Sequence, residues 1–202
     1  EVIIARNLFF FLYTGGKIHI PTLSTAKSVV LIKEAKQKGL NVTCSVSVHN
    51  LTMTDEVLNE FDTRFKVNPP IRTEEHRQAL IAGVLDRTID CITSDHCALD
   101  IEHKKMEFDM AKDGTIGLES AFGSLLNILP LEVVVEKLNA AKTIFELENN
   151  TININQKASF TLFNPQGNST FSKKLILSKS QNSAFLNQDL KGEVYGILNN
   201  GI

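Results

Sequence analysis

The segment Thr88–His96 constrains the fold of this chain more than any other. Its apolar run Ile89–Ile92 is rich in β-branched residues and short, which is typical of a buried strand. The run is followed by Asp95 and His96, so a carboxylate follows the predicted strand directly. In an α/β barrel the catalytic groups collect at that end of the strands, where a carboxylate can bind a metal and accept a proton. A structural alternative remains, because Ser-Asp after a strand is also a good helix N-cap.

Helix and strand patterns alternate around this segment and predict a parallel sheet. Residues 25–38 divide into an apolar and a polar helical face and end before Gly39. Asn41–Val48 then alternates Val and Cys with polar residues, as a strand does, and Glu74–Leu85 reads as a further helix. Strands that alternate with helices along the chain indicate an α/β fold.

Four segments carry recognisable motifs in a consistent order. They are Ser24–Ser28, with S-T-x-x-S; Lys66–Arg72, close to K-x-N-P-P-L-R; Ile89–His96; and Gly114–Glu119, with G-x-x-G-x-E. Together they resemble dihydroorotases, which belong to the metal-dependent amidohydrolase superfamily of TIM barrels.

The resemblance implies the C-terminal half of a (β/α)₈ TIM barrel for residues 1–148. Residues 149–202 resemble part of the small β domain of amidohydrolases, and Ser178–Phe185 matches its S-K-S-x-N-x-x-F segment. A complete barrel needs roughly 250 residues, whereas this chain has 202. We therefore expect the missing N-terminal half, or a second chain, to complete the barrel.

The resemblance also assigns candidate roles within the site. Asp95 is expected to be the catalytic proton acceptor and a metal ligand, with one or two zinc ions as the cofactor. Asn68 and the backbone at Gly114 are expected to contact the substrate. His49 is expected to hydrogen-bond either a substrate or a loop carbonyl. Structural alternatives are an Asn-Pro turn at Asn68 and a glycine turn at Gly114.

Two positions depart from the family pattern. Thr22 stands where the family has a histidine metal ligand, and Leu99 stands where a histidine grips the substrate carboxylate. His19 lies close to the ligand position but is expected to face the core or a neighbouring helix. The charged segment Asp100–Lys112 is expected to form a mobile loop over the barrel mouth.

Three functional hypotheses follow from the resemblance and its departures. The first is a metal-dependent hydrolase of a cyclic amide, acting on dihydroorotate or carbamoyl-aspartate in pyrimidine biosynthesis. The second is a catalytically inactive homologue that serves as an assembly or ligand-binding partner. The third is a hydrolase of a different, neutral cyclic amide or imide.

Composition and charge indicate the cellular location and the kinds of partner of the protein, rather than its reaction. The chain is 43% hydrophobic and 22% charged, with a formal net charge of −2. These values are ordinary for a soluble globular protein and indicate neither a nucleic-acid nor a membrane partner. Three cysteines without a C-x-x-C pair favour a reducing, cytoplasmic location. We expect a homo-oligomer, and we expect the apolar run Leu8–Leu12 to be buried against the missing half of the barrel.

Overall fold

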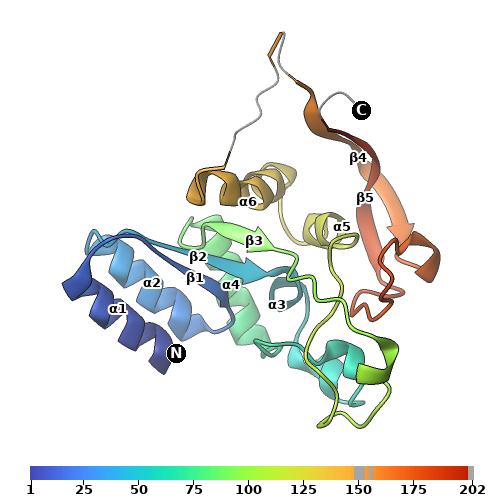
Figure 1. The fold of residues 1–202 in the computed structure, drawn as a ribbon, viewed down its shortest axis with the longest axis horizontal. Helices are drawn as coiled ribbons and strands as arrows, with labels where there is room; N and C mark the ends of the chain where they lie inside the picture. Colours follow the sequence, from blue (N-terminus) through green and yellow to red (C-terminus); the bar gives the residue numbers. More distant parts are fainter. Residues whose placement is uncertain (148–152, 155–156, 200–202) are drawn as a thin grey trace.

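The computed structural model describes residues 1–147, 153–154 and 157–199 of the chain, and it has an α/β fold (Figure 1). A three-stranded parallel sheet in the order β1-β2-β3 forms its centre. A separate antiparallel pair follows later in the chain. The strands are β1 (Ile18–Leu23), β2 (Val42–Ser47), β3 (Cys91–Thr93), β4 (Ser159–Thr170) and β5 (Asp189–Asn199).

Helices α1, α2 and α4 lie along one side of the parallel sheet, and the β4–β5 pair stands at the far end of the molecule beside α5 (Figure 1). Helix α6 packs against β3. Short 3₁₀ turns occupy 55–58, 63–65, 101–103 and 173–175. The helices are α1 (Val2–Thr14), α2 (Ala26–Gln37), α3 (Val48–Thr52), α4 (Glu74–Leu85), α5 (Ala121–Leu126) and α6 (Leu131–Ile144).

The two long helices of the predicted α/β pattern form where local signals place them. Thr25 caps α2, since its Oγ1 accepts a hydrogen bond from the Ser28 amide at 3.2 Å. Gly39 follows the helix with a φ of +79°, a left-handed conformation that suits glycine. Helix α4 spans the predicted Glu74–Leu85 without change. Capping and periodicity therefore suffice to define these elements.

The parallel sheet has one apolar and one polar face. Val42, Cys44 and Val46 of β2 pack into the core with residues of α2 and α4. On the other face His19 contacts Thr43 Oγ1 through Nδ1 at 2.9 Å and Ser45 Oγ through Nε2 at 3.3 Å. His19 therefore faces side chains of β2 on the polar face rather than the apolar core, and its ring centroid lies 5.2 Å from that of Phe145, just after α6.

A partly buried ion pair joins α2 to the beginning of β3. Lys36 Nζ contacts both carboxylate oxygens of Asp90, at 2.7 and 2.8 Å, and also donates to the Thr88 carbonyl. Asp90 Oδ2 accepts the Cys44 amide of β2 at 2.8 Å. One carboxylate therefore joins a helix and two adjacent strands.

The apolar run Leu8–Leu12 is only partly buried within this chain. The run Leu8–Leu12 lies inside one continuous helix, α1, in which Leu8 and Phe11 are buried. The other three residues of the run are more than half exposed: Phe9, Phe10 and Leu12. Within this chain one face of the helix buries only part of the run, because five consecutive residues point in all directions around a helix. Burial of the remaining side chains against the missing half of the barrel stays a prediction.

The second part of the chain forms two long strands, and one of them runs through dipeptides that are typical of turns. These are Asn164-Pro165 and Gly167-Asn168, yet strand β4 continues through Asn164–Asn168 with an irregularity in its register with β5. The sequence Ile152-Asn153-Ile154 alternates as a strand does, but Asn153 and Ile154 lie in no strand. Residue 152 and the predicted boundary at 148/149 lie outside the described residues. No helix of the described residues is long and apolar enough to cross a membrane.

Substitution of Lys36 tests the ion pair. In Lys36→Met we expect a loss of about 2 kcal/mol in the free energy of unfolding, because the partly buried Asp90 carboxylate loses its cation. Lys33→Met is the matched control on the same helix, since Lys33 pairs with Asp86 at an exposed position. There the expected loss is below about 1 kcal/mol. Urea unfolding measures both, and equal losses would contradict the prediction.

Candidate functional site

The carboxyl ends of the three parallel strands meet at one edge of the sheet. Thr22 lies near the end of β1, His49 follows β2, and Asp95 follows β3. Ser47 of β2 pairs with Thr93 of β3, so His49 and Asp95 each lie two residues beyond the same paired position. The register therefore brings these two side chains to neighbouring places.

A cavity of about 270 Å³ opens at this edge. It is lined by all four residues that the sequence singled out for the site: His49, Asn68, Asp95 and Gly114. The remaining lining residues are Val67, Cys97, Asp113 and Thr115. The structure thus gathers four separate chain segments around one hollow.

His49 is fully buried and makes no hydrogen bond within the described residues. Its exposed fraction is 0%, and neither ring nitrogen has a partner there. Nε2 lies 3.7 Å from Asp95 Oδ2, beyond hydrogen-bond distance. Loss of hydration lowers the pKa of His49 to about 4, so the ring is neutral near pH 7. The structure shows no hydrogen bond from His49 to a loop carbonyl within the described residues.

Asp95 occupies a left-handed backbone conformation, with φ at +48°. Its amide donates to Thr93 Oγ1 at 3.1 Å, which holds the turn after β3. Burial raises the pKa of its carboxyl group. No helix begins here, because the next helical element is the short turn Ile101–His103, so Asp95 is not an N-cap.

Gly114 is held between two other segments of the chain. Its amide donates to the Lys66 carbonyl at 2.9 Å, and its carbonyl accepts from Asn182 Nδ2 at 3.0 Å. Its φ is +143°, and a Cβ here would lie 2.7 Å from Cys97 Sγ. Only glycine fits this position, which makes Gly114 more than a turn before the next helix.

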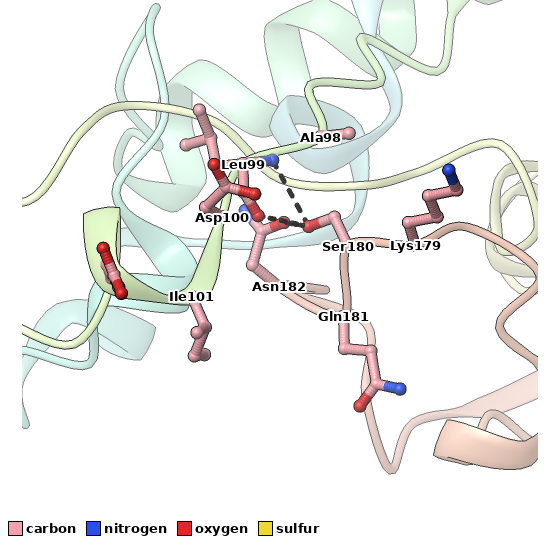
Figure 2. Close-up of a pocket in the computed structure, with 9 residues that line it drawn as sticks. Ala98, Leu99, Asp100, Ile101, Lys179, Ser180, Gln181 and Asn182 are labelled. Carbon is pink, nitrogen blue, oxygen red and sulfur yellow. Dashed lines mark hydrogen bonds between the residues drawn. The ribbon is translucent and has the colours of Figure 1, made fainter.

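The segment Ser178–Phe185 supports the cavity from behind, in a way that sequence reasoning missed. Ser180 Oγ accepts the Leu99 amide at 3.3 Å and donates to the Leu99 carbonyl at 2.7 Å, beside its contact with Asn182 Oδ1 (Figure 2). Figure 2 shows these groups at a second hollow, of about 580 Å³, between residues 98–102 and 179–182. The S-K-S-x-N-x-x-F motif marks this segment in the sequence. It does not reveal the contacts that the segment makes, because their partners lie more than 60 residues away.

The described residues do not by themselves make a metal centre. No three side chains of His, Cys, Asp or Glu among them lie close enough to hold an ion. Asp95 and the unpartnered His49 supply two candidate donors, whereas a catalytic zinc takes three protein ligands. Thr22 does not line the cavity; its amide donates to Ser45 Oγ at 3.1 Å, and its φ of +46° is unusual for a β-branched residue.

Comparison with known proteins gives a consistent picture. No protein-family model matches the chain. Dihydroorotase of Caldanaerobacter subterraneus subsp. tengcongensis is 37% identical over 201 residues, which cover 96% of this chain and 46% of that protein. Dihydroorotase of Endomicrobium trichonymphae is 39% identical over 201 residues, or 95% of this chain and 47% of the relative.

Solved structures share the fold at lower sequence identity. A D-hydantoinase superposes with a TM-score of 0.87 at 19% identity, covering 98% of this chain and 47% of its own. The inactive dihydroorotase-like domain of the Chaetomium thermophilum CAD-like multifunctional protein superposes with a TM-score of 0.73 at 22% identity. It covers 98% of this chain and 54% of its own.

The chain has the α/β fold that the sequence predicts, and it superposes on about half the length of solved D-hydantoinase structures. Its sequence is similar to those of dihydroorotases, at 37% and 39% identity over 96% and 95% of its length. It spans about half the length of the curated relatives that it matches.

The buried histidine predicts a pH dependence of stability. The folded-state pKa of His49, about 4, lies below its ordinary 6.5, so its stabilising contribution is complete above about pH 6.5. That contribution is lost as the pH falls toward about 4. Between these limits we expect the wild type to lose roughly 3 kcal/mol more stability than His49→Gln, which has no titrating group there. Denaturant unfolding across this range measures the difference, and parallel curves would refute it.

Proposed function

We propose that the complete protein is a dihydroorotase-like hydrolase of a cyclic amide, which interconverts dihydroorotate and carbamoyl-aspartate in pyrimidine biosynthesis. The observation that carries the proposal is the convergence of His49, Asn68, Asp95 and Gly114 on one cavity at the strand ends. These residues come from four segments, three of which carry dihydroorotase-like motifs. The dihydroorotase relatives support the same activity.

We assign a task to each of the four predicted site residues that line the cavity. Asp95 accepts the proton of the water that attacks the amide carbonyl and returns it to the leaving nitrogen. Its raised pKa suits this exchange, because a general base works best when its pKa lies nearer the working pH. His49 and Asn68 offer hydrogen-bond donors and acceptors to the ring. Gly114 lets the ring approach the backbone closely.

Zinc is the cofactor that we propose for the complete protein, with one or two ions per chain. When bound, zinc polarises the carbonyl and lowers the pKa of its water. Among the described residues we propose only Asp95 as a zinc ligand, so the remaining ligands would come from outside this chain. The missing half of the barrel, or a second chain, is the proposed source.

The second candidate function is that of a catalytically inactive homologue, an assembly or ligand-binding partner. Thr22 and Leu99 favour it, since threonine is a weak zinc ligand beside imidazole and leucine cannot bind a carboxylate. A solved homologue of the same fold is described as inactive, which shows that the fold persists without activity in that protein. A hydrolase of a neutral cyclic amide or imide is the third candidate, and Leu99 favours it too.

For either function we propose a cytoplasmic, homo-oligomeric protein that acts on a small molecule and binds neither nucleic acid nor membrane. The near-neutral net charge supports the last two points.

Replacement of Asp95 tests the proposed chemistry. In the complete protein, Asp95→Asn should lower kcat/KM for dihydroorotate roughly 10²–10⁴-fold, because the proton acceptor is lost. Asp113→Asn is the matched control, a second carboxylate of the same cavity that we assign no proton transfer. It should retain activity within about threefold, a loss well below that of the general base. An active Asp95→Asn variant with a normal circular dichroism spectrum would contradict the proposal.

Metal content separates the first two candidates. Elemental analysis of the complete protein should find about one or two zinc ions per chain if it is a hydrolase. An absence of metal after zinc has been supplied, together with an absence of turnover, would establish the inactive homologue instead.

A further inference from the structure

Lys104 is a buried cation whose partners are backbone carbonyls. Only 4% of the residue is exposed. Its Nζ donates to the Thr63 carbonyl at 2.9 Å and to the Lys66 carbonyl at 3.1 Å. An ammonium that leaves water retains its charge only where such acceptors surround it. The structure therefore anchors the middle of Asp100–Lys112, the segment that the sequence predicts to be a mobile loop.

The contact is reciprocal. Thr63 Oγ1 donates to the Lys104 carbonyl at 2.7 Å. In the opposite direction, Lys66 Nζ donates to the carbonyls of Phe108 and Asp109, at 2.7 and 2.8 Å. We call the two lysines and the four carbonyls that they bind the lysine clasp. It joins residues 63–66 to residues 104–109 from both sides.

The lysine clasp contacts the segments that form the cavity wall. The Lys66 carbonyl accepts from Lys104 Nζ and also from the Gly114 amide at 2.9 Å. Val67 and Asn68 follow Lys66 along the chain and line the cavity, as do Gly114 and its two neighbours. The same oxygen thus accepts hydrogen bonds from Lys104 and Gly114, and it links two of the segments that line the cavity.

From this geometry we propose that Lys104 is a positioning residue, which holds Asn68 and Gly114 at the separation that the substrate requires. Lys104 does not line the cavity itself, so it acts through the Lys66 carbonyl. The charge strengthens its hydrogen bonds to that carbonyl, since bonds from charged donors are roughly twice as strong as neutral ones. The catalytic part of the proposal rests on the proposed function, whereas the structural part does not.

Amide hydrogen exchange tests the structural part in the complete protein. Lys104→Met keeps the length of the side chain but removes its donors. Exchange of the Gly114 amide should then accelerate roughly tenfold, because its acceptor is no longer held. The control is Lys105→Met, a change at the exposed neighbouring lysine. Peptides from α2 serve as the internal reference for an intact fold.

A second pair of variants keeps the test decisive if Lys104→Met does not fold. Lys66→Met removes the opposite half of the clasp and should accelerate exchange in residues 104–112. Lys104→Arg keeps a cationic donor and should restore slow exchange at Gly114. Unchanged exchange at Gly114 in a folded Lys104→Met, or in the Lys66→Met variant over residues 104–112, would overturn the proposal.

Kinetics tests the catalytic part. Lys104→Met should raise KM roughly tenfold while kcat stays within about threefold, because the walls bind substrate and transition state alike. A purely structural lysine would lower the melting temperature without this change in KM, and that result would overturn the positioning role. If the wild type shows no turnover, the proposed function fails while the exchange test still decides the clasp.

Discussion

The Asp90 carboxylate is the contact on which the sheet and its functional edge depend. It binds Lys36 of α2 and the Cys44 amide of β2, and it lies just before β3 in the chain. This fixes the register of β3 against β2 at their amino ends, where Ser45 pairs with Cys91. Residues alternate in step along both strands, so the same register delivers His49 and Asp95 together at the opposite end.

Desolvation sets the chemistry of that opposite end. It disfavours charge on both His49 and Asp95, lowering the pKa of the histidine and raising that of the carboxyl group. The histidine is neutral as a result, and its two nitrogens have no partner in the described residues. A buried polar group without a partner is costly to the fold, so His49 contributes less to packing than an apolar side chain of the same size would.

Support for the site reaches far beyond the residues that line it. Gly114 is bonded on one side through Lys66 and on the other by Asn182 of a distant segment. Leu99, which departs from the family pattern, remains bonded to Ser180 in the same framework. The hydrogen-bonded framework around the cavity thus includes positions whose side chains depart from the family pattern. This combination suits either an altered substrate or a retained binding role, and the metal and Asp95 experiments distinguish them.

The sequence by itself determined the elements whose signals are local. Helices α2 and α4 follow from caps and periodicity, and the motifs mark where Asn68, Asp95 and Gly114 lie along the chain. Only the tertiary structure decided that these residues share a cavity with His49, that Lys104 is buried, and that β4 runs through its Asn-Pro signal. The physical reason is the distance along the sequence between the residues that each interaction joins. A cap acts across three residues, whereas the Lys104 and Asn182 contacts join positions about 40 and 68 residues apart, and no pattern within one segment encodes them.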